Sequence, residues 1–161
     1  MKSLKELYRI GKGPSSSHTM GPQKAAQTFA SHNKDAAAFE VTLYGSLAAT
    51  GRGHMTDVAI DEVLRPIAPL RIEWQPRVFL PFHPNGMKFV AFDKDKNKTN
   101  EWICYSVGGG ALSEGENSRW LNNLRNVYQK NTLTDIQQWC EENGRGYWEY
   151  VNECEEEDIW D

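Results

Sequence analysis

Apolar and polar residues alternate along several short stretches of this chain, which is the pattern of half-buried β-strands. The pattern predicts strands at 39–45, 71–74, 77–80, 87–92 and 102–107. Pro76 marks an edge or a turn between the second and third of these strands. Asn85 followed by Gly86 is a strong hairpin signal, so residues 81–86 are expected to turn the third strand into the fourth.

Apolar residues spaced three and four apart predict helices before this strand region. The first is expected near the N-terminus, where Ser3 and Glu6 form a capping box. Its apolar stripe consists of Leu4, Leu7, Tyr8 and Ile10, and Gly11 ends it. A second helix is predicted over Gln23–Ser31, with Gly21 and Pro22 at its Ncap and N1 positions.

Three further helices are predicted downstream. One covers residues 56–64, is capped by Thr56 or Asp57, and ends at Pro66. Another starts near 132–134, with Thr132 or Thr134 as its cap, and stops near Gly144. The last spans 146–157, and its inward side chains are expected to be Trp148, Val151 and Ile159. Residues 113–130 show mixed spacing and receive no assignment.

Helices and antiparallel hairpins arrive in blocks rather than in strict alternation. This order predicts an α+β fold with a mixed or antiparallel sheet and packed helices. A chain of 161 residues is long enough for one domain with a genuine core and an appendage. We expect a domain over 1–131 and a helical segment over 132–161.

The stretch Gly11–Pro22 combines three serines, His18 and Thr19 between glycine and proline residues. Its polarity and its prolines exclude the interior of a helix or a central strand. It leads into a predicted helix N-terminus, where backbone N–H groups and the helix dipole favour an anion. We therefore expect a loop that binds a carboxylate or a phosphate and carries a titratable histidine. The alternative is a serine-rich surface loop with an exposed histidine.

A second polar stretch, Gly45–Asp57, leads into another predicted helix. Glycines on both sides of Arg52 permit close approach of the backbone to a ligand. An arginine, His54 and Asp57 at one strand-to-helix junction form the kind of cluster that catalysis uses. Alternatively, Asp57 is only a helix cap and His54 is only solvated. The presence of two such loops, each with glycine, threonine and histidine before a helix, favours one shared site.

The composition excludes several classes of protein. The charged fraction of 25% and apolar fraction of 39% fit a globular protein, and the net charge of −4 argues against nucleic-acid binding. The chain has no apolar run long enough to span a bilayer and no signal-peptide pattern at its N-terminus, so the cytoplasm is the expected location. Three cysteines without Cys-x-x-Cys spacing suggest reduced, isolated thiols and no metal site. These cysteines are Cys104, Cys140 and Cys154, of which the first two are expected to be buried.

Two familiar catalytic motifs are absent from the sequence. The run Gly108–Gly110 lacks the lysine and the glycine spacing of a Walker loop or a dinucleotide fingerprint. A hydrolase built on Ser, His and Asp is disfavoured because the chain has no nucleophile-elbow pattern.

Five stretches in register resemble the iron–sulfur-dependent L-serine dehydratases. They are 13–22 (Gly-Pro-Ser-Ser-Ser-His-Thr-Met-Gly-Pro), 43–48 (Leu-Tyr-Gly-Ser-Leu-Ala), 50–57 (Thr-Gly-Arg-Gly-His-Met-Thr-Asp), 83–87 (His-Pro-Asn-Gly-Met) and 105–110 (Tyr-Ser-Val-Gly-Gly-Gly). Together they cover about residues 9–112 and identify the chain with the smaller, beta portion of those enzymes. The chain also resembles the allosteric substrate-binding domain of some phosphoglycerate dehydrogenases, which supports an anion-binding role.

The resemblance implies conversion of L-serine to pyruvate and ammonia. In that family a [4Fe–4S] cluster acts as Lewis acid on the serine hydroxyl while a base removes the α-proton. The cluster is bound by a larger catalytic domain that is missing here, so the implied partners are that domain or chain and L-serine. No cofactor is expected in this chain, which we expect to be inactive alone, and homodimerisation stays open.

The resemblance also implies roles for individual residues. The substrate-binding set is Ser15, Ser16, Ser17, Thr19 and Thr56, of which the first four are expected to hold the carboxylate. His54, with His18 as second choice, is expected to transfer a proton or position the substrate, and Asp57 to orient a histidine. A competing hypothesis is a regulatory module in which the same loops bind serine or another small carboxylate and signal to a partner.

Overall fold

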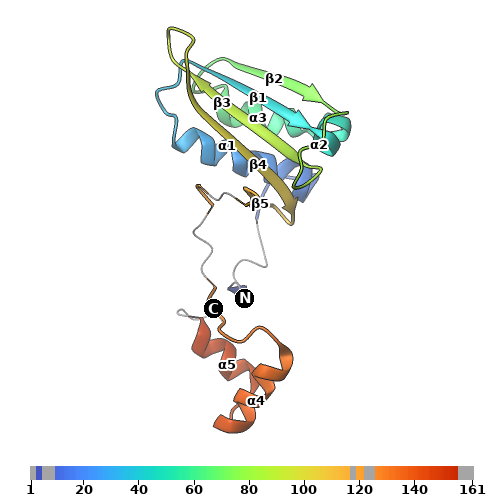
Figure 1. The fold of residues 1–161 in the computed structure, drawn as a ribbon, viewed down its shortest axis with the longest axis vertical. Helices are drawn as coiled ribbons and strands as arrows, with labels where there is room; N and C mark the ends of the chain where they lie inside the picture. The colour runs from blue at the N-terminus through green and yellow to red at the C-terminus, as the bar shows by residue number, and fades with distance from the viewer. Residues whose placement is uncertain (1–2, 5–9, 117–118, 122–125, 156–161) are drawn as a thin grey trace. The chain divides into compact units, whose positions relative to one another are not determined.

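A computed structural model describes residues 3–4, 10–116, 119–121 and 126–155. The chain divides into two compact units (Figure 1). The sheet unit comprises residues 10–121, and the terminal unit combines the N-terminal residues with 122–161. Of the helix predicted at the N-terminus, Glu6, Leu7 and Tyr8 lie outside the described residues. No helix in the described ranges is long and apolar enough to cross a membrane.

The sheet unit is built on a five-stranded mixed sheet with strand order β2-β1-β3-β4-β5. The strands are β1 (Ala38–Tyr44), β2 (Leu70–Gln75), β3 (Gly86–Phe92), β4 (Lys98–Gly108) and β5 (Ala111–Ser113). β1 and β2 run parallel, and the other neighbours are antiparallel. The predicted α+β class with a mixed sheet is confirmed. Three consecutive glycines have positive φ: Gly108 ends β4, and Gly109 and Gly110 form the tight turn to β5.

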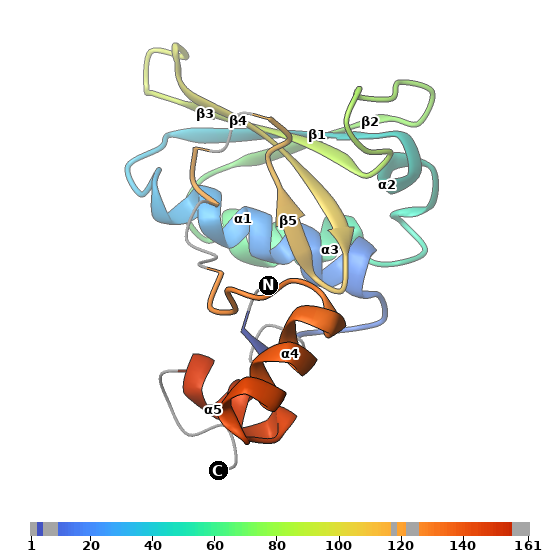
Figure 2. The ribbon, with the colours of Figure 1, turned by 60° about the horizontal axis from the view of Figure 1, so that its bottom comes forward.

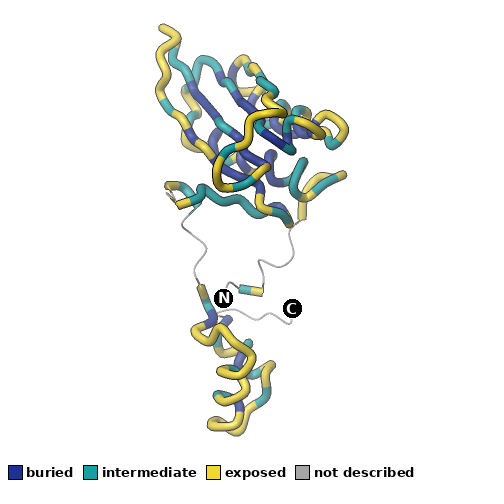
Figure 3. The backbone as a smooth tube through the Cα atoms, turned by 45° about the vertical axis from the view of Figure 1, so that its right-hand side comes forward, coloured by how far each residue is buried: buried dark blue, intermediate teal, exposed yellow. Residues whose placement is uncertain are grey.

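One face of the sheet carries the core. Val41, Phe89 and Trp102 lie side by side in the register of β1, β3 and β4, and all three are buried. This face packs against α1 (Gly21–Ser31) and α3 (Thr56–Leu64), which lie together beneath the sheet in Figure 2. Buried residues accordingly concentrate in the strands and in these helices (Figure 3). This packing holds the N-terminal ends of α1 and α3 at fixed positions.

The strand predicted over 77–80 is wrong. These residues form a loop, because the prolines at 76, 81 and 84 have no N–H to donate to a sheet ladder. Asn85 and Gly86 form no hairpin with that segment; β3 pairs with β1 and β4 instead. Asn85 is buried, and its side-chain amide donates to the Ser106 carbonyl oxygen at 3.1 Å. Asn85 therefore fastens the start of β3 to β4.

The serine stretch is also more helical than the sequence predicts. Ser16–Met20 form a π-helical turn (η2) that runs directly into α1, so Met20 takes the Ncap position and Gly21 and Pro22 are the first two residues of α1, one position further in than predicted. Ser15 is the cap, and its hydroxyl accepts a hydrogen bond from the His18 N–H at 3.1 Å. The wider π turn suits Pro22, which has no N–H to donate to an α-helical bond.

The second polar stretch begins with a short helix rather than a loop. This helix, α2, covers Gly45–Thr50 and is followed by turns up to α3. The predicted caps of α3, Thr56 and Asp57, are wrong, because Met55 takes the Ncap position in the left-handed region with φ 57°. The buried Thr56 hydroxyl bonds to another segment instead of capping its own helix.

The terminal unit holds two helices, α4 (Leu133–Asn143) and α5 (Tyr147–Cys154). Thr132 caps α4 as predicted, and Gly144 ends it in the left-handed conformation. Trp148 does not point inward as expected: it is 59% exposed, whereas Tyr150 on the same helix is buried. Val151 is half-buried, and Ile159 lies outside the described residues. Beyond the helices, the buried Glu155 carboxylate accepts hydrogen bonds from the Tyr128 hydroxyl and the Leu4 N–H.

Gly21 is predicted to tolerate no side chain at the junction of η2 and α1. A Cβ at this position would lie 2.1 Å from Ser106 Oγ, a buried hydroxyl with no hydrogen-bond partner among the described residues. Gly21→Ala is therefore expected to destabilise the chain by about 1–3 kcal/mol in urea unfolding, through overpacking. Adding Ser106→Gly removes the clashing atoms and should restore most of that loss. Equal or greater instability of the double variant would contradict this explanation.

Candidate functional site

The two polar stretches of the sequence are joined by a pair of reciprocal hydrogen bonds. The Thr19 hydroxyl donates to the His54 carbonyl oxygen at 2.7 Å, and the Thr56 hydroxyl donates to the His18 carbonyl oxygen at 2.5 Å. Both threonines are almost completely buried. We call these two bonds the threonine clasp. They hold each histidine through the backbone and leave both imidazoles nearer the surface.

The clasp brings the two imidazoles into contact. The ring centroids of His18 and His54 lie 4.9 Å apart, with the planes tilted by 41°. His54 Nδ1 lies 3.0 Å from the Thr50 carbonyl oxygen, and because a carbonyl only accepts, this nitrogen carries the hydrogen. His54 Nε2 has no hydrogen-bond partner within the described ranges. In the neutral ring that nitrogen holds the lone pair, as a proton acceptor requires.

His18 is held differently, because both of its ring nitrogens face serine hydroxyls. Nδ1 lies 2.9 Å from the Ser17 hydroxyl and Nε2 lies 3.4 Å from the Ser46 hydroxyl. Burial and the nearby His54 lower the pKa of His18, and the Ser46 backbone opposes this in part. His18 is therefore biased toward the neutral state.

The pKa of His18 is expected to rise when His54 is replaced by alanine, because both the burial and the neighbouring charge diminish. An NMR titration of the imidazole protons measures this shift. His32→Ala is the control, since His32 stacks on Trp120 rather than on His18 and should leave the His18 pKa unchanged. The pKa of His18 is lower in the folded protein than in the unfolded chain. The contribution of His18 to the free energy of unfolding is therefore present above about pH 6.5 and is lost as the pH falls through the lowered pKa. An unchanged His18 pKa in His54→Ala would contradict the proposed electrostatic contact.

The three serines of the first stretch occupy different environments. Ser15 caps η2, Ser17 bonds to the His18 ring, and Ser16 is exposed. Thr19 and Thr56, which the sequence assigned to substrate binding, use their hydroxyls in the threonine clasp. While those bonds hold, the two threonines position the histidines rather than face a ligand.

Sequence reasoning missed Ser46 as a member of this site. Ser46 lies at the start of α2, where Gly45 adopts φ 51° and the chain turns sharply out of β1. This turn carries the Ser46 hydroxyl to His18, which is 28 positions away in the sequence. The glycine-serine pair at the end of a predicted strand was the signal that could have indicated Ser46. No local pattern in the sequence indicated that Ser46 would face His18.

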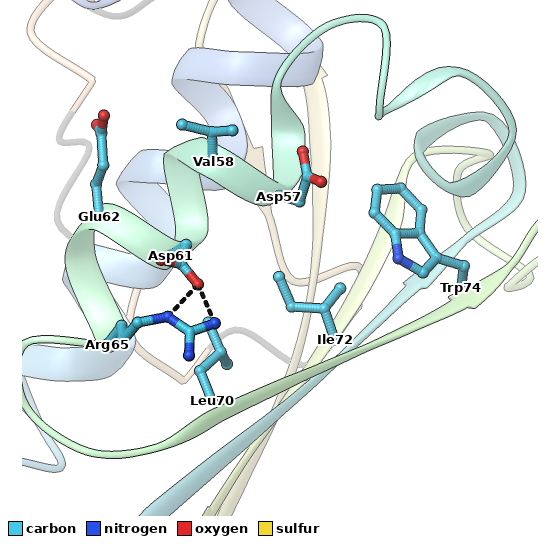
Figure 4. A pocket seen from close by; sticks show the side chains of 8 residues that line it. All are labelled: Asp57, Val58, Asp61, Glu62, Arg65, Leu70, Ile72 and Trp74. Carbon is cyan, nitrogen blue, oxygen red and sulfur yellow. Dashed lines mark hydrogen bonds and ion pairs between the residues drawn. The ribbon is translucent and has the colours of Figure 1, made fainter.

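No hydrogen bond or ion pair joins Asp57 to either histidine in the described part of the chain. It lies in the first turn of α3 and lines a pocket of about 310 Å³ between α3 and β2 (Figure 4). Across that pocket lies Trp74, whose ring also carries the Arg52 guanidinium at 5.2 Å. Asp61 and Arg65, on the same helix, form an ion pair.

An iron–sulfur cluster is held by several thiolates that converge on it. The three cysteines of this chain lie on three different elements: Cys104 within β4, Cys140 within α4 and Cys154 at the end of α5. Complete burial raises the pKa of the Cys104 thiol well above its usual range, with a further contribution from Glu114. Among the described residues, no group of three or more His, Cys, Asp or Glu side chains is arranged to hold a metal ion.

Comparison with known families agrees with the motifs around the two histidines. The model of the family described as the serine dehydratase beta chain matches residues 3–73 and 68–117. The chain belongs to this family. The matched residues include both arms of the threonine clasp, the start of α2 and the turn between β4 and β5.

The chain is also similar to individual proteins named L-serine dehydratase. It is 29% identical to L-serine dehydratase of Haemophilus influenzae, over 89% of this chain and 41% of that protein. It is 34% identical to L-serine dehydratase of Mycobacterium bovis, over 68% of this chain and 32% of that protein. L-serine dehydratase 2 of Escherichia coli shares 30% identity over 89% of this chain and 41% of the relative. The chain thus spans about two fifths or less of these relatives.

Proposed function

We propose that this chain is the beta portion of an L-serine dehydratase and contributes residues to a composite active site. The threonine clasp carries this proposal: it places His18 and His54 together in a chain of the serine dehydratase beta family. The relatives named L-serine dehydratase extend for more than half of their length beyond the matched region. We assign the remaining part of the active site to that additional portion.

Conversion of L-serine to pyruvate and ammonia requires loss of the α-proton and of the β-hydroxyl. The resulting enamine then reacts with water, which releases ammonia and leaves pyruvate. We assign proton transfer to His54, whose Nδ1 is fixed on the Thr50 carbonyl and whose Nε2 is available to accept. His18 is held by two serine hydroxyls and is biased toward the neutral state, and we assign it the role of orienting the neighbouring His54 ring.

We assign the substrate carboxylate to the serine turn. Ser16 is exposed at the beginning of η2, and Ser15 and Ser17 flank it. A helix start offers N–H groups and a partial positive charge to a carboxylate. Asp57 faces the α3–β2 pocket, so any orienting effect it has on a histidine would be indirect. In this proposal the serine turn binds the carboxylate and the histidine pair acts on the α-proton, two groups that are bonded to the same carbon of L-serine.

The iron–sulfur cluster that the family resemblance implies belongs, in this proposal, to the portion that the relatives carry beyond the match. The three cysteines here provide no site for it. We therefore infer that the chain alone is inactive, and that its partners are the cluster-bearing portion and L-serine.

Pyruvate release from L-serine under anaerobic conditions tests this function. The chain alone, the cluster-bearing portion alone and their mixture are compared at equal concentrations. Activity of the mixture with none in either part supports a composite site. Equal activity of the cluster-bearing portion without this chain would overturn it and would favour a regulatory role for the serine loop.

A further inference from the structure

A loop beside the histidine site exposes a group of large apolar side chains. Val78, Phe79 and Phe82 are 43%, 63% and 51% exposed, and they lie within five consecutive positions between β2 and β3. We call these three residues the apolar loop. Exposed apolar residues that occur singly are common on protein surfaces, whereas a group of large ones within one short loop is a candidate interaction site.

The apolar loop is attached to the same backbone that positions Ser46. The Gly45 N–H donates to the Val78 carbonyl at 2.9 Å, and the Ser46 N–H donates to the Pro84 carbonyl at 3.0 Å. The Phe79 ring packs so closely on Gly45 that a Cβ there would lie 2.9 Å from it. Phe82 is anchored on Tyr105, with ring centroids 5.2 Å apart. These contacts hold the apolar loop against the segment that carries Ser46, whose hydroxyl faces His18.

We propose that the apolar loop is the docking surface for the remaining portion of the dehydratase, and that docking there covers the histidine site. This inference rests on the proposed function, which requires such a portion. Two observations favour that occupant over a second copy of this chain. The patch adjoins the candidate site through Ser46, and the relatives continue for more than half of their length beyond the match. Covering the site would exclude water from the proton-transfer step.

Binding of this chain to the separately produced cluster-bearing portion, measured by calorimetry under anaerobic conditions, tests the proposal. Phe79→Ser is expected to weaken the affinity at least tenfold, and Val78→Ser at least threefold. The matched controls are Leu133→Ser and Ile67→Ser, whose side chains are 70% and 40% exposed elsewhere on the chain. Both controls should bind as the unchanged chain does, and circular dichroism verifies that every variant is folded.

Amide hydrogen exchange of the unsubstituted chain provides a second readout that needs no variant. Amide exchange within residues 78–82 should be slower in the complex than in the free chain, whether or not exchange in α4 or α5 also slows. A complex that forms with unchanged exchange at 78–82, and with full affinity of both patch variants, would overturn the proposal. Concentration-dependent self-association that Phe79→Ser abolishes would also overturn it, in favour of a second copy.

The same complex separates this proposal from the proposed function. His54→Ala should bind normally and lose turnover, whereas the patch variants should lose affinity. Turnover that depends on this chain together with unaffected binding of the patch variants leaves the function standing and removes the docking surface. Patch-dependent binding with full turnover of His54→Ala leaves the docking surface and removes the assigned role of His54. Failure of the two parts to bind at all removes both.

Discussion

Replacing His54 by alanine is expected to lower the turnover of the reconstituted dehydratase by about 10²- to 10⁴-fold, the usual loss when a general acid–base group is removed. The reason is the arrangement of this ring: its Nδ1 is fixed on the Thr50 carbonyl, and its Nε2 is the nitrogen left to accept a proton. His18, by contrast, has serine hydroxyls at both nitrogens. Pyruvate formation at saturating L-serine is the measurement.

Added imidazole distinguishes lost chemistry from lost structure in His54→Ala. The deleted ring leaves space beside His18, and free imidazole placed there should restore part of the turnover with a saturable dependence on its concentration. His32→Ala is the control, because His32 stacks on Trp120 and touches neither ring of the pair. Turnover of His54→Ala within twofold of the unchanged chain would remove proton transfer from this residue.

Removing both hydroxyls of the threonine clasp is expected to destabilise the sheet unit by about 2–4 kcal/mol. Thr19→Val and Thr56→Val keep the volume of these buried side chains but delete one bond each to the opposite histidine carbonyl, at about 1–2 kcal/mol per bond. Thr19 costs more, because its hydroxyl also accepts the Ser15 N–H at 3.2 Å. Urea unfolding of the two single variants and the double variant measures these losses.

The two threonines should be energetically coupled, because each bond holds the segment that the other bond needs. A coupling free energy of about 0.5–1 kcal/mol is expected in the double-mutant cycle. Thr28→Val is the matched control: its hydroxyl donates to the Lys24 carbonyl within one turn of α1, and its loss should cost less than 1 kcal/mol. Strictly additive losses for Thr19 and Thr56 would show that the clasp is two independent bonds.

Local patterns predicted most of the secondary structure correctly. β1, β3 and β4 cover most of the segments in which strands were predicted, and α1, α3 and α4 cover the segments expected of them. Burial does not alternate strictly along these strands, since each contains three consecutive buried residues. The prediction of a strand at 77–80 failed because an alternating pattern does not show which strand is available for pairing. The expected partner, β3, has β1 and β4 on its two sides. The turn at 16–20 failed because polarity and proline content do not reveal a π-helical turn continuous with α1.

The sequence by itself determined the family, the mixed α+β architecture and the two histidine-containing stretches that make up the candidate site. Only the tertiary structure decided how those stretches meet. The clasp bonds join residues 35 and 38 positions apart, and the contact of Ser46 with His18 spans 28 positions. Such contacts depend on how α1 packs against α3 beneath the sheet, and a linear pattern of residues records the helices but not their packing. For the same reason the family resemblance could imply substrate binding for Thr19 and Thr56 but not the bonds that their hydroxyls donate to the two histidine carbonyls in the packed structure.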